Sequence, residues 1–279
     1  MSNYKREKPV LQVNHLSVRY GKGCPLCSTH LEKNRCSACK TVWAANDLSL
    51  EVYPGEILGI VGESGSGKST LMQSLYFDVE PTEGEAYLSE FEDGEQNIWE
   101  VSSAAKREIK NKIMGMVYQN PIRGLRMDYS SASNIAEKII AAGNRNAGEM
   151  TGRAKELLEA VEILTSRMVE APKNFSGGMQ QRVQISKALA NNPSILLLDE
   201  VTTGLDLSVQ ARVLDLIRKI KNKYGISILL VSHDLAVIRM LADRTIVMLD
   251  GKIIESGLTD QILEDPQHAY TQQLVHSLL

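Results

Sequence analysis

Four continuous runs of apolar residues along the chain predict buried β-strands. They are Ile57 to Val61, Ile113 to Val117, Ser194 to Leu198 and Ile226 to Val231. Short runs that are apolar throughout are typical of parallel strands that helices cover on both faces. The pattern therefore predicts an α/β fold with a mostly parallel core sheet. Polar residues follow the runs, and in open sheets of this class ligands bind at the carboxyl edge of the strands.

The start of the chain has a different pattern. Strand formers are frequent at Val10 to Tyr20 and again at Asp47 to Val52, which predicts an antiparallel β flap over residues 10–56. The two strands are separated by an insertion at residues 23–40 that contains all four cysteines.

Helical patterning dominates residues 120–185 and predicts a helical subdomain, with a break at Gly143 to Gly148. Residues 57–119 and 186–279 are then expected to form the core of one domain that covers residues 1–279. A charged stretch, Glu100 to Lys112, is expected to be a solvated helix.

A complete phosphate-binding loop follows the first apolar run. Its glycines let successive N–H groups point inward, and the helix start that follows adds a positive dipole to this anion site. The lysine of such a loop reaches the β- and γ-phosphates, and the next hydroxyl binds Mg²⁺. The residues are Gly62, Glu63, Ser64, Gly65, Ser66, Gly67, Lys68, Ser69 and Thr70.

Polar side chains at the ends of the other three runs complete a site for phosphoryl transfer. Asp199 can hold the magnesium shell, while Glu200 faces the attacking water as the catalytic base. His233 could hydrogen-bond a γ-phosphate and orient the water. Gln119 could contact magnesium or the water. We therefore expect Mg²⁺ to be held by Ser69, Gln119 and Asp199.

Together these motifs resemble those of the ATP-binding cassette (ABC) ATPases over about residues 10 to 279. The resemblance implies the ABC ATPase fold, in which the core sheet is RecA-like. It also implies ATP as the nucleotide and Mg²⁺-dependent hydrolysis to ADP and phosphate. It further implies that Tyr20 stacks on adenine and that Gly62 to Thr70 form the Walker A loop. The Q-loop glutamine is Gln119. The signature motif begins with Ser176, Gly177, Gly178 and Met179. The Walker B carboxylate is Asp199, and the catalytic carboxylate is Glu200. Asp206 belongs to the D-loop, and His233 is the switch histidine.

The resemblance also implies a head-to-tail dimer, either of two copies or with a paralogous cassette subunit. The signature of one subunit would close over ATP held by the other's Walker A loop. Ser176 is placed to cap a helix, and Gly177 and Gly178 would expose backbone N–H groups to an anion.

Composition narrows the class of protein. The 279 residues are 43% hydrophobic, enough for one α/β core with a subdomain. The net charge is -3 and no basic stripe occurs, which argues against binding to nucleic acid. We find no secretory leader at the start and no apolar stretch of about 18 residues that could span a bilayer. A cytoplasmic protein is expected, and any membrane part of a transporter must come from another chain.

The cysteines are arranged as two CxxC pairs, Cys24 with Cys27 and Cys36 with Cys39. This spacing is typical of a zinc ribbon, and in a reducing compartment metal binding is favoured over a disulfide. A structural Zn²⁺ is expected; an iron-sulfur cluster, another metal, free thiols or disulfides remain alternatives. His30 is the only reserve ligand nearby. The insertion follows Tyr20 closely, so it could brace the adenine edge or bind a partner.

Two further segments bear on the machine that the ATPase serves. The tail Asp265 to Gln272 resembles that of peptide and nickel importer ATPases and of the ATP-binding subunit of the phosphonate carbon-phosphorus (C-P) lyase system. The segments Asn120 to Arg126 and Ser131 to Ile135 resemble the lyase subunit more. The resemblance implies a motor for soluble lyase core proteins. The alternatives are an importer subunit, peripheral at the inner membrane beside permease subunits, and another soluble cassette protein.

Overall fold

Two compact units make up the protein, for which the computed structural model describes residues 8–276. The first unit comprises residues 1–102 and 229–279, and the second comprises residues 103–228. Each contains a pair of parallel strands together with helices, so the predicted α/β class is confirmed. Within the described residues, no helix combines the length and apolar character that crossing a bilayer requires.

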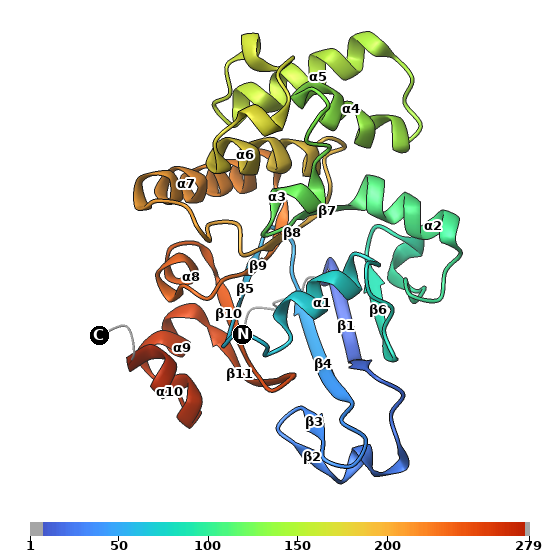
Figure 1. Ribbon diagram of the computed structural model, residues 1–279, viewed down its shortest axis with the longest axis vertical. Helices are drawn as coiled ribbons and strands as arrows, with labels where there is room; N and C mark the ends of the chain where they lie inside the picture. The colour runs from blue at the N-terminus through green and yellow to red at the C-terminus, as the bar shows by residue number, and fades with distance from the viewer. Residues whose placement is uncertain (1–7, 277–279) are drawn as a thin grey trace, which may run out of the picture. The chain divides into compact units, whose positions relative to one another are not determined.

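The first unit carries an antiparallel sheet (Figure 1). Its strands are β1 (Leu11–Tyr20), β2 (Leu31–Glu32), β3 (Arg35–Cys36), β4 (Val42–Val52) and β6 (Glu83–Leu88). They lie in the order β2-β3-β4-β1-β6, so the two predicted flap strands are neighbours and the insertion adds the small β2–β3 hairpin at one side.

Strand β4 starts earlier than the sequence pattern predicts. It begins at Val42 instead of Asp47, because the pairing with β1 continues to Tyr20 opposite Val42. Arg19 pairs with Trp43 in the same ladder, and its guanidinium lies 5.8 Å from the Trp43 ring centroid. The long β4 therefore connects the cysteine insertion directly to the end of β1.

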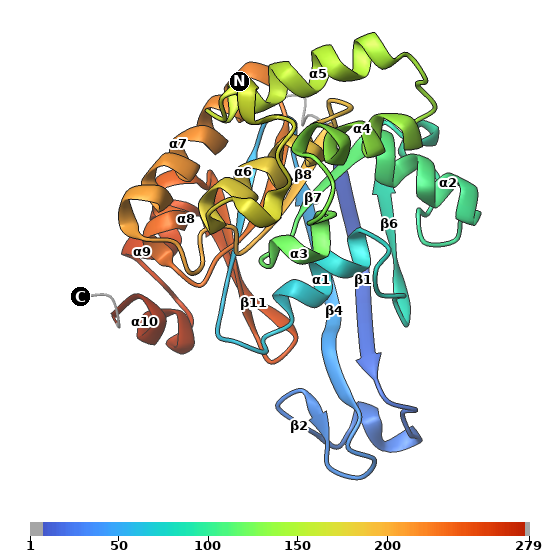
Figure 2. The ribbon, with the colours of Figure 1, turned by 45° about the horizontal axis from the view of Figure 1, so that its top comes forward.

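Further strands of the first unit lie in the order β11-β10-β5-β9. They are β5 (Ile57–Val61), β9 (Ser227–Val231), β10 (Arg244–Leu249) and β11 (Lys252–Leu258). Strands β5 and β10 are parallel, while β11 returns antiparallel to β10. Every residue of β5 and β9 is buried, as their apolar sequences predict. The helices are α1 (Lys68–Leu75), α8 (Leu235–Leu241), α9 (Thr259–Glu264) and α10 (Ala269–His276), the last two following β11 (Figure 2).

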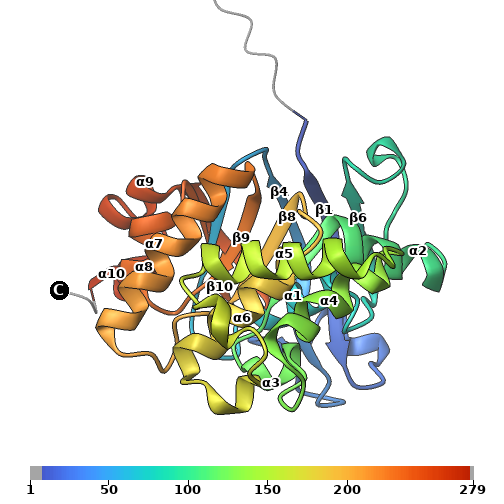
Figure 3. The same cartoon turned by 90° about the horizontal axis from the view of Figure 1, so that it is seen from above.

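The second unit combines the parallel pair β7 (Met114–Val117) and β8 (Ile195–Asp199) with helices. These are α2 (Ser103–Glu108), α3 (Pro121–Gly124), α4 (Ser131–Ala141), α5 (Ala147–Ala160), α6 (Gly177–Ala188) and α7 (Leu207–Tyr224). Figure 3 shows α4, α5 and α6 beside one another. The turn between α4 and α5 includes Gly143, and Asn146 caps α5 by accepting from two backbone N–H groups, which confirms the predicted break. Short 3-10 turns occur at Pro25–Ser28, Glu92–Gly94, Thr165–Arg167 and Pro172–Asn174.

The predicted solvated helix at Glu100 to Lys112 is wrong in part. The α-helix covers only Ser103–Glu108 and continues as a π-helical turn over Ile109–Ile113. Both isoleucines of this turn are buried. The charge pattern alone did not reveal this, because exposed charged residues such as Glu108 and Lys112 lie beside them on the same segment.

Candidate functional site

The phosphate-binding loop connects β5 to α1 and closes around the Lys68 ammonium. Lys68 Nζ donates hydrogen bonds to Gly62 O (2.8 Å), Glu63 O (2.7 Å) and Ser66 Oγ (3.3 Å). Gly67 caps α1 with a φ of 105°, and a Cβ there would lie 1.9 Å from Ala44 O, so only glycine allows this closure. The residues present therefore fit the cradle for phosphate that the sequence predicts.

Two more predicted residues of the first unit lie on elements next to this loop. The Ser232 N–H donates to Ile60 O (3.2 Å), so His233 follows β9 at the end of β5 from which the phosphate loop emerges. Tyr20 is the last residue of β1, and 49% of its surface is exposed. An exposed ring at the end of a strand can stack on a planar base.

The second unit brings Gln119 and Glu200 together. Gln119 Nε2 donates to Glu200 Oε2 (2.8 Å), and Thr203 Oγ1 donates to the same oxygen (3.2 Å). The contact follows from the parallel register of β7 and β8, in which Val117 pairs with Leu198. Asp199, one residue earlier, is only 4% exposed.

Glu200 has an unusual backbone conformation. Its φ is 48°, in the left-handed region that non-glycine residues rarely adopt. Such a conformation costs on the order of 1–3 kcal/mol and is common where a site must hold a side chain in one direction. The strain at Glu200 is therefore consistent with a catalytic position.

The predicted capping role of Ser176 is confirmed in position only. Ser176 occupies the N-cap position of α6, but its side chain makes no capping hydrogen bond, and its carbonyl accepts from the Gln180 N–H (2.9 Å). Gly177 is exposed with no atom within 4 Å of its Cβ position, whereas a Cβ on Gly178 would lie 2.5 Å from Val209 Cγ1. Gly178 therefore allows α7 to pack closely on α6, and Gly177 presents open backbone.

Asp206 has a structural role in this chain. Its carboxylate caps α7 by accepting from the Val209 N–H (3.0 Å) and from the Ser208 hydroxyl (2.7 Å). These two hydrogen bonds, the hydroxyl above all, hold the pKa of Asp206 below its usual range. The predicted D-loop aspartate thus fixes the start of the helix that packs on Gly178.

Sequence reasoning missed Gln184, which lies on the same helix as the signature and is 1% exposed. Its Oε1 accepts from the Tyr118 N–H (2.8 Å) and its Nε2 donates to Tyr118 O (3.0 Å). The Gln184 amide thus pairs with the N–H and the carbonyl of Tyr118 as a neighbouring strand would. This pairing fixes the backbone immediately before Gln119. Only the tertiary fold brings the two segments together, so no local signal could have identified it.

Replacing Gln184 with Leu should lower the free energy of unfolding by about 1–3 kcal/mol, because it removes both hydrogen bonds between the buried amide and the Tyr118 peptide. Denaturant unfolding measures this change. Gln184→Glu keeps an acceptor for the Tyr118 N–H but buries a carboxylate beside Tyr118 O, so it should also destabilise the protein. Wild-type stability in Gln184→Leu would contradict the role of this amide.

The four cysteines form one cluster. Their sulfur atoms all lie within 4.8 Å of one another, and no disulfide joins them. The separations are 3.9 Å for Cys24 to Cys27, 3.8 Å for Cys24 to Cys36 and 3.5 Å for Cys27 to Cys39. A tetrahedral zinc with Zn–S bonds of about 2.3 Å requires S···S distances of about 3.8 Å, so the donor set fits one such ion.

The hydrogen bonds around the cluster favour the thiolate form of Cys39 and oppose that of Cys24. The hydrogen bond between Cys39 Sγ and Thr41 Oγ1 (3.2 Å), together with one to the Thr41 backbone, lowers the pKa of Cys39 to about 6. The hydrogen bond with Cys39 in turn raises the pKa of Cys24 to about 12, as expected when one negative charge is shared among four sulfurs. His30 contacts Thr29 and is not part of the cluster.

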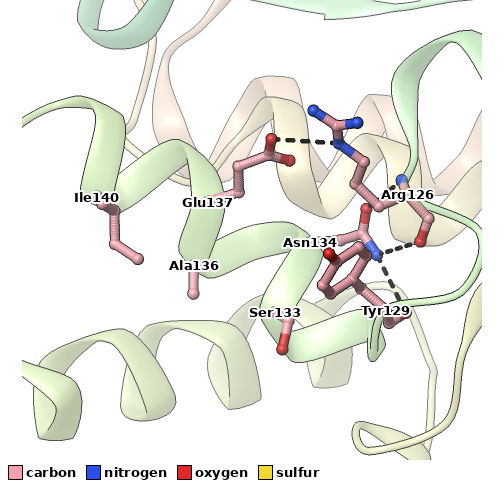
Figure 4. A pocket seen from close by; sticks show the side chains of 7 residues that line it. All are labelled: Arg126, Tyr129, Ser133, Asn134, Ala136, Glu137 and Ile140. Atoms are coloured by element: carbon pink, nitrogen blue, oxygen red, sulfur yellow. Dashed lines mark hydrogen bonds and ion pairs between the residues drawn. The ribbon is translucent and has the colours of Figure 1, made fainter.

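A hollow of about 480 Å³ lies on the second unit (Figure 4). It is bordered by residues of the two segments, Asn120 to Arg126 and Ser131 to Ile135, that resemble the lyase subunit more than importer ATPases. Asn134 donates to Arg126 O (3.0 Å) and Tyr129 O (3.3 Å), and Arg126 Nε lies 3.6 Å from Glu137 Oε1. The lining residues are Arg126, Tyr129, Ser133, Asn134, Ala136, Glu137 and Ile140.

Comparison with known proteins places the chain in a family. The family model "ABC transporter" matches residues 45–203. The putative phosphonates utilization ATP-binding protein PhnK of Escherichia coli is 41% identical over 272 residues, which cover 98% of each chain. The oligopeptide transport ATP-binding protein OppF of Bacillus subtilis is 36% identical over 250 residues, covering 89% of this chain and 80% of OppF.

Solved structures agree with these relatives. The ATP-binding cassette MJ0796, in a dimeric post-hydrolysis state bound to ADP and Pi, superposes with a TM-score of 0.75 at 27% identity. The match covers 89% of this chain and 98% of that one. The protein described here is thus a member of the ABC transporter family, an ATP-binding and ATP-hydrolysing cassette subunit.

Proposed function

We propose that this ATPase is the dimerising motor subunit of a phosphonate C-P lyase complex in the cytoplasm. The observation that carries the proposal is the 41% identity, over 98% of both chains, to a protein named for phosphonates utilization. The oligopeptide transport relative is less similar and leaves a fifth of its own length unmatched.

In the proposed mechanism, the phosphate loop and Lys68 bind the β- and γ-phosphates of ATP. Ser69, Gln119 and Asp199 hold Mg²⁺, which would supply charge neutralisation for the transferred phosphoryl group. Glu200 orients the attacking water, and the hydrogen bond that it accepts from Gln119 links the base to the magnesium ligands. His233 contacts the γ-phosphate, and Tyr20 stacks on adenine.

The signature completes the site from a second subunit. The cassette relative MJ0796 is a dimer in the presence of ADP and Pi, which supports ATP-driven association of two copies of this chain or of this chain with a paralogue. The free Cβ space at Gly177 and the lack of a capping bond from the Ser176 side chain leave an N-terminal face of α6 that can meet an anion.

The cysteine insertion is proposed to bind one structural Zn²⁺ and to brace the adenine edge. The buried Thr41 connects the cysteine cluster to the segment after Tyr20. Its Oγ1 lies near Cys39 Sγ and accepts a hydrogen bond from the N–H of Gly23 (3.0 Å), which is three residues after Tyr20. Four thiolates leave no open position on zinc, so the ion would supply shape and no chemistry.

A second candidate function is the nucleotide-binding subunit of a peptide or nickel importer, peripheral at the inner membrane. It is favoured by the relatedness to OppF. In this candidate function, the hollow at Arg126 to Ile140 would receive a membrane subunit. In the lyase complex, the same face would meet a soluble core protein.

Affinity capture distinguishes the two candidates. The Glu200→Gln variant loaded with ATP should retain soluble C-P lyase proteins from detergent-treated extract, identified by mass spectrometry. Lys68→Ala, which cannot grip the phosphates, serves as the control and should retain much less. Recovery of integral membrane permease subunits would refute the lyase assignment and favour the importer.

A further inference from the structure

The tail segment Asp265 to Gln272 contacts the phosphate loop. Tyr270 lies in the first turn of α10, and its hydroxyl oxygen accepts a hydrogen bond from the Glu63 N–H (2.8 Å). Both residues belong to the first unit, although they are far apart along the chain. The sequence marked this tail only through its resemblance to relatives, and nothing in the proposed mechanism uses it.

Several hydrogen bonds hold Tyr270 in place. The Glu255 carboxylate, on β11, accepts from the N–H groups of Gln267 (2.8 Å) and His268 (3.0 Å). His268 Nδ1 accepts from the Tyr270 N–H (3.1 Å). Partial burial opposes ionisation of Glu255, but these N–H groups hold its pKa below its usual range. We call Glu255, Gln267, His268 and Tyr270 the tail clasp.

The clasp and Lys68 bind opposite groups of the same loop residue. Lys68 Nζ donates to Glu63 O (2.7 Å), while Tyr270 accepts from Glu63 N–H. If Lys68 turns to the phosphates of bound ATP, it releases the carbonyl of Glu63. The Tyr270 hydroxyl then remains as a side-chain contact that fixes the first turn of the loop.

We propose that Tyr270 is a positioning residue for the phosphate loop. Its hydroxyl holds the Glu63 backbone so that the inner N–H groups of the loop are arranged before the triphosphate arrives. Preorganisation of this kind raises affinity because less ordering is left for binding. The inference rests on the proposed nucleotide site and adds a residue that acts through the loop without touching the ligand.

Tyr270→Phe tests the inference by removing only the hydroxyl. Binding of Mg-ATP and of Mg-tripolyphosphate is measured by calorimetry on the full chain. Both affinities should fall about fivefold, equivalent to about 1 kcal/mol, and KM for ATP should rise while kcat is retained. Tyr20→Ala should weaken ATP binding alone, since tripolyphosphate has no base to stack.

Two further variants sharpen the result. Tyr87→Phe removes a hydroxyl that donates to Glu85 (2.9 Å) on an exposed edge, and it should bind both ligands as the wild type does. Glu255→Gln loosens the clasp without touching the loop and should weaken both affinities to a smaller extent. The unfolding midpoint of each variant shows whether a general loss of stability causes the change.

Wild-type affinities in Tyr270→Phe would overturn the role of Tyr270 and leave the nucleotide site intact. A loss confined to ATP would also overturn it, because the effect would then lie at the base. If the unmodified chain bound neither ligand, the proposed nucleotide site itself would be wrong, and the inference would fail with it.

Discussion

Glu200→Gln should slow ATP hydrolysis by about 100- to 10,000-fold, the usual contribution of a positioned general base. The substitution preserves size and leaves an oxygen that can accept from Gln119 and Thr203, both of which donate to Glu200 Oε2. ATP binding should therefore persist while the chemical step fails. The ATP-bound dimer should accumulate, because the variant cannot convert its bound ATP to ADP and phosphate.

Phosphate release in a single turnover measures the first effect, and light scattering with saturating Mg-ATP measures the second. Glu162→Gln is a matched control: Glu162 also has a left-handed backbone (φ 59°), and its carboxylate lies 3.6 Å from Arg182. It should hydrolyse ATP normally. A Glu200→Gln protein that stays monomeric would refute ATP-driven dimerisation, and an unchanged rate would refute the role of Glu200.

Cys36→Ser should abolish metal binding and unfold the insertion. Cys36 is fully buried and its sulfur lies 3.8 Å from that of Cys24, so an alcohol in its place leaves an incomplete donor set inside the hairpin. Metal binding in small zinc modules supplies on the order of 10 kcal/mol of apparent folding energy, more than a hairpin of two-residue strands can replace. Removal of the metal with a chelator should have the same effect.

Elemental analysis gives the metal content, and hydrogen exchange of residues 23–40 reports the unfolding. Ser37→Ala, next to the buried cysteine, should keep the metal. If the insertion braces the adenine edge, Cys36→Ser should weaken ATP binding and spare tripolyphosphate. Full metal occupancy in Cys36→Ser would contradict the four-thiolate site, and unchanged ATP affinity would rule out the brace.

Local sequence patterns predicted the strands well because burial on both faces leaves an unbroken apolar run. Strands β5, β8 and β9 lie within one residue of their predicted ends at Val61, Leu198 and Val231. No strand was predicted at β6, whose sequence mixes glutamate and glycine and which pairs along β1. Its extended form depends on a neighbouring strand and not on its own composition.

The candidate site likewise includes residues that local sequence patterns predict and contacts that they do not predict. Motif spacing predicted the phosphate loop, Gln119, Glu200 and the four cysteines as site residues without a structure. Motif spacing predicted that Ser176 caps α6, but the side-chain hydrogen bond of such a cap is absent. It also gave no indication of the role of Gln184. Both depend on the position of a side chain relative to a distant peptide, which no spacing along the chain encodes.

By itself, the sequence determined the α/β class, the phosphate loop and the thiol donor set, because each needs particular residue types at short, regular separations. Only the tertiary structure decided that Gln119 meets Glu200, that Gly178 serves packing against Val209, and that Tyr270 holds Glu63. These contacts join segments that are remote in the chain, and their geometry arises only when burial of the apolar strands brings those segments together.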